Sequence, residues 1–418
     1  MFFVTLSYAA HSLSVQETIR YSNNTGQNLT DFVLAVEPNL SGHCFTLKTI
    51  GEDGGAITNY RLDGQRLTIN LDAPLVPEAV TTFTINYDLA LPSKSFTKTF
   101  GYLSHQVNLT DWYPFIVPYS GGWILHDPNP FGDHLVYDSA NFEVNLKVDD
   151  PKVVIAASGL SEANGDWTRY RLSGARTFVF SASDQFLSEQ STVGTTVIRS
   201  YYFAGNENPG DAVLNMAKQA VALYGVKFAP PPYPSLNVVE TSMSDGEEFD
   251  GLVFLATRFY DAYDGTGRND LITIGAHEIS HQWWFGLVEG DRAVAPWVDE
   301  AMAVYSEKLF YEFNYPHYGN WWWQYRVDYF NPSGYVDGRL YDFPTFQIYV
   351  NAVYLNGAHF VQDLRTRLGD EAFFAFLKDY AARFAHARVS PEDFFSAVRM
   401  HTTADFSDIL QKYFMRAY

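Results

Sequence analysis

The hydrophobic period of the chain changes near residue 204, and this change constrains the fold more than any other feature of the sequence. Up to about Phe203, short segments such as TFTINYDLAL and FEVNLKV alternate apolar and polar residues, and turn sequences such as Asp63-Gly64 separate them. A period of two residues is typical of strands with one buried face. The first part of the chain therefore predicts an antiparallel β domain, a saddle or a sandwich, over residues 1–203.

Beyond Gly205 the apolar residues recur at the spacing of helices. The segment DAVLNMAKQAVALYGV begins this pattern, and one strand-like run, Ser235 to Glu240, interrupts it. The pattern then continues in the segments 271–288, 296–314, 346–368, 370–386 and 405–416. We expect an α+β chain of two domains, in which residues 204–418 form a mainly helical domain with a small sheet.

The net charge of −20 over 418 residues restricts the partners of the chain. Such a charge repels nucleic-acid backbones and anionic membranes. No uninterrupted apolar stretch approaches the roughly 18 to 20 residues of a membrane-spanning helix. The opening MFFVTLSYAA has the pattern of a strand and lacks the basic start of a signal peptide. We expect neither nucleic acid nor a membrane as a partner, in a soluble protein that is either cytoplasmic or secreted after removal of a leader.

The segment HEISH, residues 277 to 281, has the spacing of a metal site. His277 and His281 are four positions apart in a helical pattern, so both imidazoles leave the same helix face about one turn apart, as two ligands of one Zn²⁺ require. Glu278 is displaced round the helix, where its carboxylate lies beside the metal without being a ligand. This is the position of a general base.

A third ligand is needed if one coordination position is to stay open. Pro296 opens a second helical segment, and Glu300 lies in its first turn, nineteen positions beyond His281. A returning helix would bring Glu300 back to the histidine pair. Two imidazoles and one carboxylate favour zinc, which we expect at one ion per chain. Glu307, two turns further on the same face, is placed either to accept the free N–H of a ligand histidine or to act as an ordinary surface acid.

These residues resemble the aminopeptidase N-like zinc metallopeptidases, a family of gluzincins with the pattern His-Glu-x-x-His, eighteen residues, then Glu. The segment Trp297-Val298-Asp299-Glu300-Ala301 is similar to the family's Trp-Leu-Asn-Glu-Gly. The β-rich first half resembles the family's N-terminal saddle domain, and the segment from about residue 204 resembles its thermolysin-like catalytic domain. The large C-terminal helical domain of many members has no counterpart in this sequence.

The resemblance also implies an oxyanion donor and an amine-binding loop. Tyr354, in the frame Tyr-x-x-Gly-Ala, matches the tyrosine that donates a hydrogen bond to the oxyanion in the family. In the stretch DGEEFDGL, Glu248 falls at the position of the glutamate that binds the substrate's α-amino group. Glu247 replaces an apolar residue near the first side-chain pocket. A second amine contact in relatives comes from the β domain, where Gln106 is the nearest candidate.

The family resemblance implies a zinc aminopeptidase that acts on peptides with a free N-terminus. Two alternatives from the residues stay open. A thermolysin-like endopeptidase shares the zinc chemistry but needs no free amine, and a peptide-binding scaffold could keep the fold without catalysis. A metal-dependent hydrolase of a lipid epoxide, as in some relatives, is a third and more remote alternative.

Overall fold

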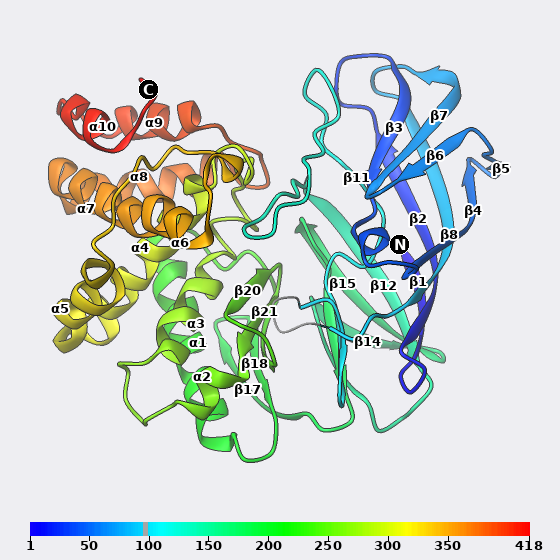
Figure 1. Cartoon of the computed structure of the whole chain (residues 1–418), viewed down its shortest axis with the longest axis horizontal. Helices are drawn as coiled ribbons and strands as arrows, with labels where there is room; N and C mark the ends of the chain where they lie inside the picture. Colours follow the sequence, from blue (N-terminus) through cyan, green and yellow to red (C-terminus); the bar gives the residue numbers. More distant parts are fainter. Residues whose placement is uncertain (95–98) are drawn as a thin grey trace.

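The computed structural model describes residues 1–94 and 99–418. Two parts lie side by side in Figure 1: strands of the first half of the chain form one, and helices of the second half form most of the other. Each part has its own large hydrophobic core. The predicted α+β class is confirmed.

The β domain consists of three sheets. The largest has the strand order β14 (Leu160–Asn164), β15 (Trp167–Ala175), β12 (Ala140–Val148), β1 (Phe2–Ser7), β2 (Ser12–Ser22), β8 (Val80–Ala90), β4 (Phe45–Glu52), β5 (Gly55–Ala56). The second has the order β13 (Val154–Ala157), β16 (Phe180–Ser183), β10 (Gln106–Leu109), β9 (Gly101–Leu103). The third has the order β11 (Phe115–Ile116), β3 (Leu29–Ala35), β7 (Arg66–Leu75), β6 (Tyr60–Asp63).

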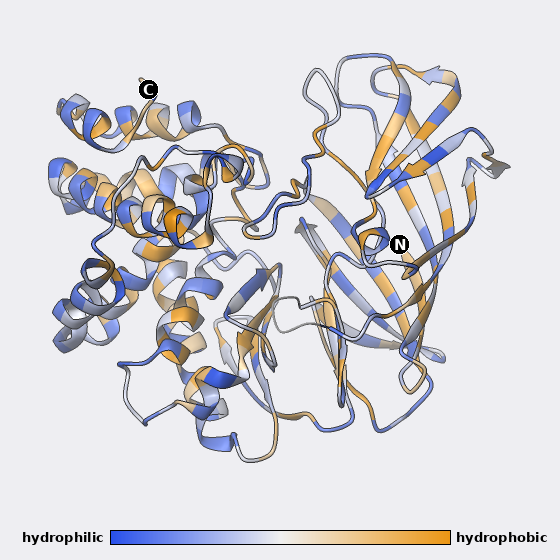
Figure 2. Ribbon diagram, in the orientation of Figure 1, coloured by the Kyte–Doolittle hydropathy of each residue, from blue (hydrophilic) through white to orange (hydrophobic). Residues whose placement is uncertain are grey.

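The period of two that the sequence shows is the period of burial in these strands. In β8 every second residue from Thr81 to Leu89 is buried, and those between are partly exposed. Figure 2 shows hydrophobic and hydrophilic residues alternating along strands of the large sheet. One face of β8 therefore packs against the hydrophobic core and the other face contacts solvent, as is common in antiparallel sheets.

A five-stranded sheet begins the second part of the molecule. Its order is β17 (Leu187–Val193), β18 (Thr196–Tyr202), β19 (Ser235–Thr241), β21 (Leu252–Ala256), β20 (Gly246–Phe249). The predicted boundary at residue 203 falls directly after β18, whereas the β17–β18 hairpin joins this sheet through β19. The acidic stretch DGEEFDGL is not a loop: it pairs with β21 as the edge strand β20, and Gly251 with φ +70° makes the turn.

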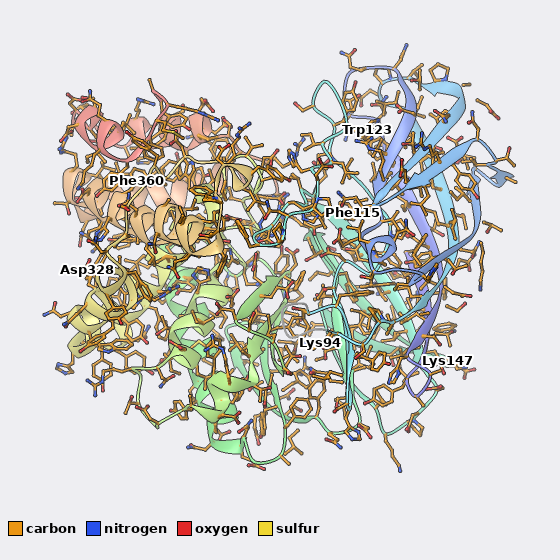
Figure 3. All side chains as sticks on the ribbon, viewed as in Figure 1. Lys94, Phe115, Trp123, Lys147, Asp328 and Phe360 are labelled. Atoms are coloured by element: carbon orange, nitrogen blue, oxygen red, sulfur yellow. The ribbon has the colours of Figure 1, made fainter. Side chains whose placement is uncertain are left out.

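Ten α-helical segments are present in the described residues: α1 (Glu207–Lys227), α2 (Thr257–Asp261), α3 (Asp270–Ser280), α4 (Trp297–Asn314), α5 (Gly319–Trp322), α6 (Phe346–Tyr349), α7 (Asn356–Leu368), α8 (Asp370–Arg383), α9 (Pro391–Met400) and α10 (Ser407–Tyr413). Short 3₁₀ turns are η1 (Glu37–Leu40), η2 (Pro316–Tyr318), η4 (Asp328–Phe330) and η5 (Leu340–Asp342), and π-helical turns are η3 (Trp323–Val327) and η6 (Val350–Leu355). Phe360 of α7 lies among these helices in Figure 3, on the side away from the β domain.

Two predicted helices differ from the structure. The helix expected over 271–288 ends at Ser280, where the amides of Gln282 and Trp283 donate to carbonyls only three residues back. The amides of Gly286, Leu287 and Val288 then donate to carbonyls five residues back. The helix expected over 346–368 is interrupted by the π-helical turn η6. No helix within residues 1–94 and 99–418 has the length and apolar character needed to cross a membrane.

Candidate active site

The helices α3 and α4 bring three potential metal ligands together. His277 lies in the last turn of α3, His281 caps its C-terminus, and Glu300 lies in the first turn of α4. The two histidine Nε2 atoms are 3.2 Å apart, and Glu300 Oε2 lies 3.4 Å from Nε2 of His277 and 3.6 Å from Nε2 of His281. All three side chains are almost completely buried.

This triangle fits a tetrahedral zinc site. With ligand bonds of about 2.0–2.1 Å, two ligands of a tetrahedral ion are about 3.3 Å apart. His281 Nδ1 lies 2.9 Å from the carbonyl of Trp284, and a carbonyl can only accept, so the proton of neutral His281 is on Nδ1 and its Nε2 lone pair faces the triangle. Glu300 Oε2 is buried without a hydrogen-bond partner. Three potential ligand atoms that converge in this way suit a bound cation.

Glu307 contacts the ring nitrogen of His277 that faces away from the three-ligand triangle. Its Oε1 lies 2.9 Å from His277 Nδ1, and the carboxylate also accepts from Trp322 Nε1 at 3.0 Å and from Arg326 Nε at 2.8 Å. Glu307 is fully buried in α4. Such a partner fixes which nitrogen of the imidazole is free for a metal and orients the ring.

The pKa values of the three candidate ligands reflect this arrangement. Burial lowers the pKa of His277, but hydrogen bonds to Glu300 and Glu307 outweigh it and raise the pKa well above the usual range. Burial lowers the pKa of His281, which favours the neutral imidazole that binds metals. Burial acts to raise the pKa of Glu300, but its hydrogen bond to His277 and the charges of both histidines outweigh this and lower it. Glu300 therefore remains a carboxylate.

Glu278 lies beside the triangle and outside it. Its side chain is buried and lines the same cavity as the three ligands. Burial is the main reason why the pKa of Glu278 lies well above its usual range, and the charge of Glu248 adds to it. A bound dication would oppose this shift by its positive charge.

Gly246 on β20 leaves the room that Glu278 occupies. A Cβ built on Gly246 would lie 2.3 Å from Glu278 Oε1. The same Cβ would lie 2.6 Å from Glu278 Cδ and 2.6 Å from its Cγ, so we expect Gly246→Ala to displace the whole side chain of Glu278, to reduce kcat about tenfold or more and to lower the melting temperature. Steady-state kinetics together with thermal unfolding check this prediction. Unchanged kcat would show that the position of this carboxylate does not matter for turnover.

Tyr354 approaches the site from the π-helical turn η6. Its ring is stacked on that of His277 at a centroid distance of 6.1 Å, and it lines the cavity. Burial, reinforced by the carboxylate of Glu300, raises the pKa of Tyr354 well above its usual range. The phenol therefore keeps its proton and is available as a hydrogen-bond donor.

The cavity has a volume of about 430 Å³ and is lined by both domains. Glu247 and Glu248 of β20 both line it, but they are neighbours in a strand and so point to opposite faces. A carboxylate oxygen of Glu248 lies within 4.8 Å of a carboxylate oxygen of Glu278 and of a ring nitrogen of His281. Strand alternation therefore directs Glu248 toward the histidines.

The structure does not bring Gln106 to this cavity. Its amide nitrogen donates to Ser181 Oγ at 3.1 Å and to the Glu240 carbonyl at 3.0 Å, and its oxygen accepts from Thr241 Oγ1 at 2.8 Å. The bonds to Glu240 and Thr241 join β10 to β19 across the two domains. Gln106 is occupied by interdomain contacts and absent from the residues that line the cavity.

Arg292 is a cavity residue that the sequence pattern did not reveal. Its guanidinium is buried, lies over the ring of Phe285 at 4.6 Å, and forms ion pairs with Asp133, Glu248 and Asp299. Arg292 belongs to no spaced motif, and two of its three partners, Asp133 and Glu248, come from distant parts of the chain. Only its position between the two halves of the metal motif could have drawn attention to it.

The fold and the arrangement of His277, His281 and Glu300 resemble those of gluzincin metallopeptidases, and comparisons with known proteins agree. Residues 214–413 match the Peptidase family M1 domain. The chain is 25% identical over 239 residues to aminopeptidase M1-B of Oryza sativa subsp. japonica, a match that covers 53% of this chain and 27% of that protein. It is 23% identical over 226 residues to aminopeptidase M1 of Arabidopsis thaliana, covering 50% of this chain and 26% of that protein.

Solved structures match over almost the whole chain. The M1 zinc metallopeptidase from Deinococcus radiodurans has a TM-score of 0.70 at 17% identity, covering 98% of this chain and 91% of that one. A variant of that metallopeptidase bound to the peptide Tyr-Ser-Ala has a TM-score of 0.72, covering 100% and 94%. These matches confirm the resemblance to the aminopeptidase N-like gluzincins seen in the sequence, and the family model covers residues 214–413 of the 418. The matched part of this chain spans about a quarter of the length of each of the two plant aminopeptidases.

Proposed function

We propose that this protein is a zinc-dependent aminopeptidase that removes the first residue of peptides with a free N-terminus. The observation that carries the proposal is the closeness of Glu248 to Glu278 and His281, within 4.8 Å. In a peptide the α-nitrogen and the first carbonyl carbon are only about 2.5 Å apart. An ammonium held by Glu248 therefore places the first peptide bond, and no later one, beside Glu278.

His277, His281 and Glu300 would hold the zinc ion, and Glu307 would orient His277. When bound, zinc polarises the scissile carbonyl and acidifies the attacking water. Glu278 accepts the proton of that water and passes it to the leaving amine. Tyr354 donates a hydrogen bond to the oxyanion that develops on the scissile carbonyl. Glu248 binds the substrate ammonium, and Glu247 lies on the opposite face of β20, beside the first side chain.

The variant Glu248→Ala tests the proposal. Loss of a charged hydrogen bond to the substrate ammonium is expected to lower kcat/KM for an unblocked aminoacyl amide about tenfold or more, because the ammonium loses its nearest carboxylate. Hydrolysis of the N-acetylated substrate, which we expect to be slow in the wild type, should stay unchanged. A wild-type enzyme that cleaves the N-acetylated substrate as fast as the unblocked one would instead indicate an endopeptidase.

A further inference from the structure

The guanidinium of Arg292 holds together carboxylates from both domains. Arg292 Nη2 donates to Glu248 Oε1 on β20. It also donates to Asp133 Oδ2 at 2.7 Å, and Asp133 lies in the β-domain segment between β11 and β12. Nε lies 3.1 Å from Asp299 Oδ2 at the start of α4. Three carboxylates share one cation, so this buried cluster has room for a second positive charge.

The two carboxylates on Nη2 are side by side. Two charge-assisted bonds of about 2.8 Å to one nitrogen leave their accepting oxygens no more than about 5.5 Å apart. Both residues line the cavity that contains the histidines and Glu300. The bonds from Arg292 use Glu248 Oε1 and Asp133 Oδ2, which leaves the second oxygen of each carboxylate outside these bonds. The side chain of Asp133 is 46% exposed, so its second oxygen is open to a ligand.

We propose that Arg292 is a positioning residue that holds Glu248 and Asp133 together as a receptor for the substrate's α-ammonium, with Asp133 as the contact from the β domain. The ammonium has three N–H donors and can bond to the second oxygen of each carboxylate. Asp133 thus takes the place that the sequence suggested for Gln106, whose amide is already bonded across the domain interface. The inference rests on the proposed aminopeptidase function and names the residues that bind its substrate.

The test compares Asp133→Asn with Asp138→Asn. Asp138 lies in the same β-domain segment and also pairs with an arginine of the other domain, Arg388 at 3.0 Å, but it does not line the cavity. The two variants therefore remove equivalent interdomain charges, and only one of them removes a carboxylate from the cavity. Kinetics on an unblocked aminoacyl amide and its N-acetylated counterpart are measured with the zinc content and the melting temperature.

We expect Asp133→Asn to raise KM for the unblocked substrate about tenfold or more, because one of two charged contacts to the ammonium is lost. Its kcat, its zinc content and its activity on the N-acetylated substrate should stay close to wild type, and Asp138→Asn should change none of these. Arg292→Lys should also raise KM for the unblocked substrate, because a lysine ammonium lacks the planar set of N–H donors that fixes Glu248 and Asp133 relative to each other.

Three results would overturn the inference. The first is an unchanged KM in Asp133→Asn. The second is an equal loss on both substrates together with a lower melting temperature, which would make Asp133 an interdomain contact only. The third is an unchanged KM in Arg292→Lys, which would remove the positioning role. A wild-type enzyme without preference for the unblocked substrate would refute the aminopeptidase function itself, and the inference with it.

Discussion

Glu278→Gln should reduce kcat about a thousandfold while the protein keeps its zinc and its fold. The carboxylate lies beside the three ligands without belonging to their triangle, so its loss leaves the metal site intact. Glutamine has the same size and cannot accept a proton, and loss of a general base typically costs between about 10² and 10⁴ in rate. The variant therefore separates proton transfer from metal binding.

The measurement is steady-state kinetics on an unblocked aminoacyl amide, with metal analysis of the same sample. Glu371→Gln is the matched control, because Glu371 is exposed in the first turn of α8 and far from the cavity. It should keep wild-type kcat. If Glu278→Gln retained more than about a tenth of wild-type kcat, the base would have to be another group of the cavity.

The spacing of the metal motif predicted more of this site than any other pattern in the sequence. Four positions on a helix place two side chains on one face whatever surrounds them, so the closeness of His277 and His281 follows from local geometry alone. Glu300 required one further step, a helix that returns. The structure brings the three together, although the turns after His281 are wider than the predicted helix.

Residues whose position depends on tertiary contacts could not be predicted in this way. Arg292 is placed by partners from three separated segments, and no spacing rule connects them. Gln106 lies on a strand that faces the other domain, where its amide is needed for interdomain hydrogen bonds. The pairing of β20 with β21 was also hidden, because four acidic residues in six positions look like a solvated loop. That pairing determines which glutamate faces the histidines.

Residues of both domains line the cavity, so the contacts between the domains determine its shape. Arg176, directly after β15, lies 3.1 Å from Glu289 with both side chains fully buried, and it donates to the carbonyls of Phe285 and Ala387. Glu289 and Phe285 belong to the segment between His281 and Glu300. The segment that connects two of the candidate metal ligands is thereby bonded to the β domain, which links the orientation of the domains to the geometry of the site.

Removal of zinc should abolish turnover and also destabilise the fold. In the folded chain His277, His281 and Glu300 turn acceptor atoms toward one point at 3.2 to 3.6 Å, an arrangement that a cation stabilises and that is unfavourable without one. A ligand that binds only the folded state raises its stability by RT ln(1 + [L]/Kd), so a chelator should lower the melting temperature as well as the activity. Activity should fall to about 1% or less.

Zinc analysis, kinetics and thermal unfolding before and after chelation measure these effects, and the native protein should hold about one zinc per chain. Added zinc should restore both the activity and the melting temperature. Glu300→Gln supplies the control, because it weakens the site without a chelator: it should contain little zinc, and chelator should shift its melting temperature no further. Full activity of the metal-free protein would contradict the zinc mechanism, whereas loss of activity with an unchanged melting temperature would show that zinc acts in catalysis alone and that the triangle is stable without it.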